Sequence, residues 1–203
     1  MRNTVTAFAF ALVALTGTAR ADPRPSTPGE LRMEMRRVWD DQAIYTRNFI
    51  VSTLGMQPDQ GPVTQYLVDH QDVIAAAIEP FYGTEASKRL GFLLREHVVR
   101  TADLVRTISE RDVERVPRLR AYWFDNVQQI AAYLATLNPR WNKGQLEDSF
   151  EQYLDLTMDE IEGRSIRNWD WDVAAYERVG NHTAHLADFL SNGIVKQFPE
   201  RFR

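Results

Sequence analysis

Apolar side chains recur three and four positions apart along most of this 203-residue chain, the spacing that places them on one face of an α-helix. Polar and charged residues fill the positions between them. The pattern predicts helices over residues 30–55, 63–78, 84–109, 112–137, 142–163 and 169–196. No stretch alternates apolar and polar residues with a period of two, so we expect no sheet.

Proline and glycine interrupt this pattern between the predicted helices, in the stretches "MQPDQGP", "EPFYG" and "NPRW". These connections are short. Because short connections between long amphipathic helices place neighbours antiparallel, we expect an all-α, up-and-down antiparallel bundle. It should contain four or five long helices plus one short helix.

The amino-terminal segment has the features of a secretory signal peptide. An apolar run over residues 7–15 is followed by Ala19-Arg20-Ala21, which has the small-x-small form of a cleavage site. The run is too short to cross a bilayer, which takes roughly 20 apolar residues. We expect a signal peptide over residues 1–21, a flexible leader over 22–29 and a single helical domain over 30–203. The mature protein should be exported, with the periplasm favoured over the extracellular medium.

Composition narrows the classes of function. The chain has no cysteine, which excludes disulfides, thiolate metal sites, covalently attached c-type haem and cysteine nucleophiles. Without residues 1–21 the net charge is near −6, so we expect no nucleic acid and no anionic membrane as partner. No later segment is long and apolar enough for a membrane span.

Polar residues interrupt the apolar faces of the long helices near their midpoints, at Gln42, His97, Tyr153 and His182, with His185 one turn further on. In an antiparallel bundle these midpoints lie at one depth. We therefore expect a central polar layer. A faint repeat with an offset of 56 residues aligns "LREHVVRTAD" with "FEQYLDLTMD" and sets Tyr153 opposite His97.

Three interpretations of this layer remain open. The favoured one is a hydrogen-bonded network that fixes helix register, since buried polar groups are usually satisfied in this way. The second is a zinc or copper site in which His97, His182 and His185 bind the ion and Gln42 and Tyr153 line it. The third makes His97 a general base with Tyr153 as acid or oxyanion stabiliser.

Several motifs support a resemblance to a known group of proteins. Trp39 is followed by Gln42 and then Thr46-Arg47, "LLREH" ends at His97, and "GIVKQFP" lies near the carboxyl end. In these motifs the chain resembles a poorly characterised family of bacterial helical proteins. The family pattern has histidine where this chain has Gln42 and Tyr153, and the resemblance implies no established activity.

These observations predict an exported helical-bundle protein, and they favour a non-enzymatic role. The expected role is that of a binding or stress-related protein whose polar layer could hold a small ligand or a transition metal. The alternatives are a small hydrolase- or transferase-type enzyme using a His97/Tyr153 pocket, and a purely structural protein that binds a protein partner of unknown kind.

Overall fold

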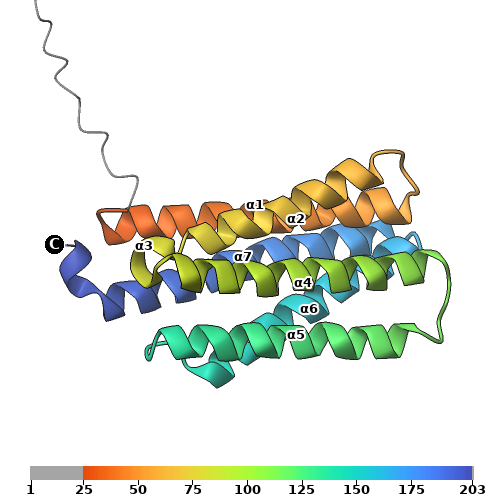
Figure 1. Ribbon diagram of the computed structural model, residues 1–203. Helices are drawn as coiled ribbons and strands as arrows, with labels where there is room; N and C mark the ends of the chain where they lie inside the picture. The colour runs from red at the N-terminus through yellow and green to blue at the C-terminus, as the bar shows by residue number, and fades with distance from the viewer. Residues whose placement is uncertain (1–24, 203) are drawn as a thin grey trace, which may run out of the picture.

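A computed structural model describes residues 25–202, and this part of the chain is all-α, as the sequence predicts (Figure 1). The expected signal peptide lies outside the described residues. The helices are α1 (Pro28–Leu54), α2 (Gln60–Ala76), α3 (Glu79–Tyr82), α4 (Thr84–Ser109), α5 (Val116–Leu137), α6 (Lys143–Ser165) and α7 (Trp169–Gln197), followed by the 3-10 helix η1 (Pro199–Phe202).

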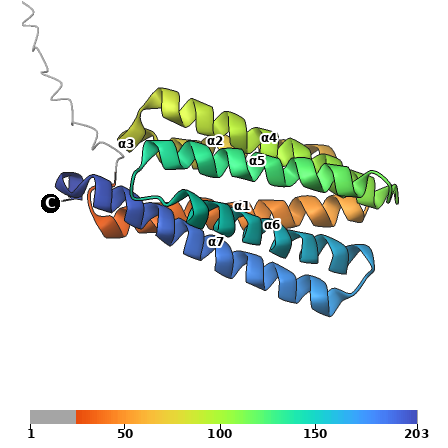
Figure 2. The ribbon, with the colours of Figure 1, turned by 90° about the horizontal axis from the view of Figure 1, so that it is seen from below.

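Six long helices form a closed ring. Helices α1, α2, α4, α5, α6 and α7 contact one another in this order, and α7 packs back against α1. Successive helices run in opposite directions along a shared long axis (Figures 1 and 2). Consequently α1, α4 and α6 run in the same direction, and these three also contact one another. The side chains that they turn toward each other form the middle of the bundle.

Local sequence signals explain where several helices begin. Thr27 and Glu30 form a capping box, in which each side chain accepts a bond from the other's backbone N–H, and Pro28 occupies the first turn. Helix α1 therefore starts two residues earlier than predicted. The side chains of Asn142 and Asn168 cap α6 and α7 in the usual way.

The structure differs from the prediction in the number of long helices, which is six where four or five were expected, because α2 is itself a long helix of 17 residues. It also differs in two connections. Helix α5 begins at Val116 rather than at 112, because α4 ends in a turn at residues 110–112 and Pro117 favours a new first turn. The "EPFYG" break contains the four-residue helix α3. Gly83 ends this helix with φ of +82°, a conformation that favours glycine.

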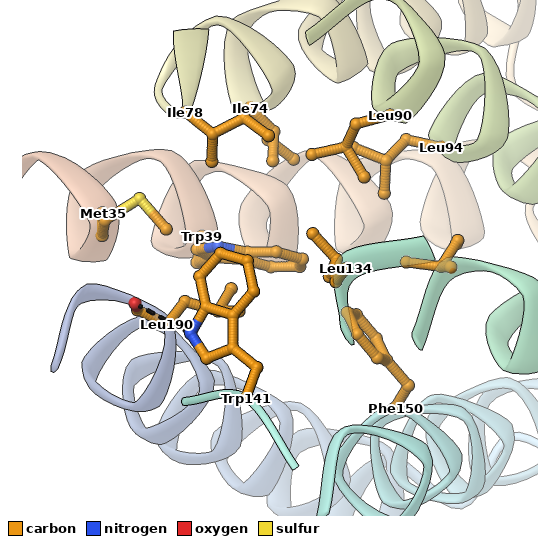
Figure 3. A pocket seen from close by; sticks show the side chains of 11 residues that line it. Met35, Trp39, Ile74, Ile78, Leu90, Leu94, Leu134, Trp141, Phe150 and Leu190 are labelled. Atoms are coloured by element: carbon orange, nitrogen blue, oxygen red, sulfur yellow. Dashed lines mark hydrogen bonds between the residues drawn. The ribbon is translucent and has the colours of Figure 1, made fainter. Parts of the chain in front are cut away.

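The interior is one continuous apolar core with contributions from every long helix. Figure 3 shows a pocket in this core, between Trp39, Trp141 and the aliphatic side chains around them. Its volume is only about 10 Å³, roughly the space of one water molecule. Trp39 Nε1 is the single buried side-chain nitrogen or oxygen without a hydrogen-bond partner in residues 25–202. A water there would have too few partners, so the pocket is a packing gap.

No helix within residues 25–202 combines the length and the apolar character that a membrane crossing requires.

Candidate functional site

The expected polar layer forms where α1, α4 and α6 meet. Gln71 Nε2 donates to Gln42 Oε1 (2.8 Å), and Gln42 Nε2 donates to the hydroxyl of Thr46 (3.3 Å). That hydroxyl lies 3.4 Å from the hydroxyl of Tyr153. The rings of Tyr153 and His97 are neighbours, with centroids 6.4 Å apart. The structure thus brings three of the predicted polar residues together, and Gln71 and Thr46 join them.

His97 is bonded at both ring nitrogens. Its Nδ1 lies 3.0 Å from Oδ1 of Asn126, whose amide group donates to the backbone oxygen of Leu93 (3.2 Å). Trp123 Nε1 donates to His97 Nε2 at 3.3 Å. Since the indole can only donate, Nε2 must accept, and the proton of the neutral ring sits on Nδ1. A second proton would point at the Trp123 N–H.

We expect His97 to remain neutral down to acidic pH. Burial lowers its pKa from 6.5 to about 4, although the bond to Asn126 acts in the opposite direction. Between these values the unfolded chain binds a proton that the folded protein does not bind. The contribution of neutral His97 to the unfolding free energy is therefore complete above pH 6.5 and is lost as the pH falls toward 4. The maximum loss is about 3 kcal/mol.

Two measurements check this expectation. The Cε1–H resonance of His97 should titrate with a pKa near 4. Between pH 7 and pH 4, the unfolding free energy of the protein should also fall by about 3 kcal/mol more than that of His97→Gln, which has no titrating ring. A resonance that titrates near 6.5 would contradict the buried neutral ring.

The layer leaves no room for a substrate or a ligand. The volume enclosed by Gln42, His97, Trp123, Tyr153 and their neighbours is about 0 Å³. Burial also raises the pKa of Tyr153, which keeps its hydroxyl protonated. The layer therefore has the properties of a hydrogen-bonded network that fixes the register of the helices.

The remaining predicted residues lie elsewhere. His182 Nε2 donates to the backbone oxygen of Ser149 (2.7 Å), since a carbonyl oxygen can only accept. Burial lowers the pKa of this ring. His185 is exposed on α7. Helix α7 packs mainly against α6 and α1, so these histidines face the edge of the bundle. Within residues 25–202, no group of three or more His, Cys, Asp or Glu side chains is arranged to hold a metal ion.

A buried ion cluster links α1, α6 and α7, and sequence reasoning did not find it. Arg47 donates to both carboxylate oxygens of Asp172 and to Glu160 (2.9 Å). Arg164 donates to Asp172 as well (2.9 Å). Both carboxylates are about 1% exposed. We define Arg47, Glu160, Arg164 and Asp172 as the ion cluster.

The two carboxyl groups of the ion cluster respond differently to burial. Burial raises the pKa of Glu160 to about 7, against the effect of its bond from Arg47. Burial also acts to raise the pKa of Asp172, but bonds from Arg47 and Arg164 outweigh it and hold that pKa below its ordinary value. Asp172 is therefore the fixed anion of the cluster and Glu160 the weaker one.

An open cleft lies beside the ion cluster, at the end of the bundle where α1, α4 and α6 terminate. Its volume is about 680 Å³, and it is lined by residues of three connections, at 54–56, 108–116 and 164–169. We call it the end cleft. Arg164 belongs to both features, since it lines the cleft and pairs with Asp172.

The three helices that end at this cleft end in the same way. In each, the backbone N–H groups of two successive residues after the helix donate to backbone oxygens of its last turn, which is the Schellman pattern. After α1, for example, Met56 N–H donates to Thr53 O and Gln57 N–H donates to Ser52 O. The residue in the left-handed conformation is Met56, Arg111 or Arg167, with φ of 49° to 61°. These are the only non-glycine residues with positive φ in the described part of the chain.

The motifs behind the family resemblance have structural roles here. Trp39 is a core residue, Thr46 joins the polar layer and Arg47 holds the ion cluster. Gln197 accepts a bond from the Tyr82 hydroxyl (2.8 Å) and donates to the backbone oxygen of Leu137 (3.2 Å). The family assignment stays a prediction: no family model, no curated protein and no solved structure matches this chain.

Proposed function

We propose that this chain is an exported, non-enzymatic binding protein whose ligand site is the end cleft, while the central polar layer serves the stability and register of the bundle. The observation that carries this proposal is the difference in free volume between the polar layer and the end cleft. The layer around His97 is filled, whereas the end cleft encloses about 680 Å³, within the range of roughly 300–1,000 Å³ typical of ligand pockets.

The chemistry of the polar layer supports a non-enzymatic role. A general base must come within hydrogen-bond reach of the proton that it removes. Both nitrogens of His97 are already bonded to protein groups, and the pKa near 4 makes this ring a weak base at neutral pH. Asn126 and Trp123 therefore occupy the positions that a substrate would need.

The backbone around the end cleft supports a binding role. Glycine is preferred in the left-handed position of a helix end, and another residue there costs about 1 kcal/mol. This chain has a long side chain at all three such positions, and all three line one cleft. Local preferences are typically broken in this way at functional sites, where the side chain has a role besides folding.

The proposed export rests on the sequence of residues 1–21, with its apolar run and Ala19-Arg20-Ala21. A periplasmic location is part of the same proposal.

An uncharged fluorescent probe tests the binding site. N-phenyl-1-naphthylamine becomes fluorescent in apolar surroundings, and we expect it to bind the folded protein. Trp169 lines the end cleft and is 53% exposed, so Trp169→Ser should weaken binding at least about fivefold through loss of aromatic contact area.

Tyr122→Ser is the matched control, because Tyr122 is an aromatic residue of similar exposure (49%) on the outer face of α5. It should leave probe binding unchanged. Equal effects of the two substitutions, or no probe binding by the native protein, would overturn the end cleft as a ligand site.

A further inference from the structure

The side chains that line the end cleft are of two kinds. Met56, Val113 and Trp169 are apolar and strongly exposed, at 79%, 75% and 53%. Large exposed apolar side chains that lie together in one hollow indicate a binding site, because a ligand that covers them removes apolar surface from water. The other long side chains of the lining are three arginines, which bind carboxylate and phosphate groups through paired N–H donors.

Among the residues that line the end cleft, arginines outnumber carboxylates. Arg164 is paired with Asp172, and its guanidinium stacks over the ring of Trp169 at 5.5 Å. Asp112 also lines the cleft, but Arg115 lies 3.6 Å from it. For Arg111 and Arg167, the described residues supply no carboxylate within ion-pair distance. Two cations therefore remain for a ligand.

We propose that the end cleft binds a single amphipathic anion, an acyl or alkyl chain that carries a carboxylate or phosphate head group. The head group pairs with Arg111 and Arg167, and the chain covers Met56, Val113 and Trp169. This inference rests on the function proposed above and adds the class of ligand.

The occupant is one molecule rather than a bilayer surface. The end cleft is a hollow of about 680 Å³, which suits a chain that inserts. Exposed acidic residues, Glu110, Glu114 and Asp170, adjoin the lining residues in sequence, and the whole chain has a net charge of −4. A flat anionic surface would meet these carboxylates as well as the arginines, and the repulsion would oppose docking.

Ligands with one chain length and different head groups test the proposal. Decanoate, decyl phosphate and decyltrimethylammonium, each below its micelle concentration, and decanol, below its solubility limit, are titrated into the purified protein by calorimetry. The indole N–H resonance of Trp169 reports the site. At least one of the two anions should bind about tenfold more tightly than decanol, and the cation more weakly than decanol. Which anion binds more tightly identifies the head group.

The arginines are tested by Arg111→Gln combined with Arg167→Gln. Glutamine is also unbranched at Cβ, so the left-handed backbone is affected little. The double variant should lose the preference for the anions and keep decanol binding. Arg140→Gln with Lys196→Gln is the control, since it removes the same charge from exposed residues at the opposite end of the bundle and should keep the preference.

The outcomes separate this inference from the function on which it rests. Equal binding of the anions and decanol, both weakened by Trp169→Ser, would overturn the anion preference and keep the end cleft as a ligand site. Binding that Trp169→Ser leaves unchanged would overturn both. Binding to phosphatidylglycerol vesicles without binding of the monomeric anions would overturn the single-molecule proposal in favour of a membrane surface.

Discussion

Replacement of Arg47 by methionine is expected to lower the unfolding free energy by about 3 to 5 kcal/mol at pH 8. Within residues 25–202, Arg47 is the only residue whose side chain donates a hydrogen bond to the Glu160 carboxylate. Asp172, in contrast, accepts from both Arg47 and Arg164. Without its guanidinium, an almost fully buried carboxylate remains unpaired, and the apolar surroundings do not solvate its charge. Chemical denaturation at constant pH measures the loss.

The loss should depend on pH with a defined sign. Burial already raises the pKa of Glu160 to about 7, and removal of Arg47 raises it further. Because the folded native protein releases this proton near pH 7 and the folded variant releases it only at higher pH, the cost of the substitution should grow as the pH rises above about 7 and level off below it. Adding Glu160→Gln should recover part of the stability at pH 8.

Arg36→Met is the matched control for Arg47→Met. Arg36 makes the same two-pronged contact with a carboxylate, that of Asp188, at 2.7 and 2.6 Å. This pair lies at the surface, where the side chains are 48% and 26% exposed. Its loss should cost less than about 1 kcal/mol, since water replaces the partner. Similar losses for the two variants would contradict the role assigned to burial.

Gly193→Ala is expected to destabilise the protein by about 3 kcal/mol, the upper range for overpacking. The indole of Trp141 lies directly against Gly193, and a Cβ there would overlap Nε1 and Cδ1 of this ring. Trp141 is 2% exposed and donates to the backbone oxygen of Leu190 (3.2 Å), so it cannot move aside without losing burial and this bond. Thermal or urea unfolding measures the effect.

Gly180→Ala tests the same substitution on the same helix without the overlap. No atom outside its neighbours lies within 4 Å of a Cβ at Gly180. Alanine also favours a helix interior over glycine, by about 1 kcal/mol, so this variant should be slightly more stable than the native protein. A Gly193→Ala variant as stable as Gly180→Ala would show that the contact with Trp141 is not tight.

Apolar periodicity was sufficient to predict the helices, since each long helix buries a stripe of its own sequence. It also predicted that Gln42, His97 and Tyr153 meet, because residues near helix midpoints share a depth in an antiparallel bundle. His182 does not join them. The hydrophobic pattern of α7 shows which residues are buried but not which neighbouring helix each of them contacts. At His182 the neighbour is α6, through the backbone oxygen of Ser149.

The ion cluster and the end cleft could not be predicted in the same way. Arg47 and Asp172 are 125 positions apart, and a charged residue on a helix gives no sign that it is buried. The end cleft depends on the path of three connections, and connections have no periodicity. One signal was present for the cleft: three helices end without glycine at the position where glycine is preferred.

The closed ring separates the order of the helices along the chain from their arrangement in space. Since α7 lies antiparallel against α1, the end of α7 and the start of α1 meet at one end of the bundle, opposite the end cleft (Figure 1). A circularly permuted chain that joins these ends and opens between Leu137 and Lys143 would keep every helix contact and leave the cleft intact. Opening at 110–115 would instead divide the ligand site between the two new termini.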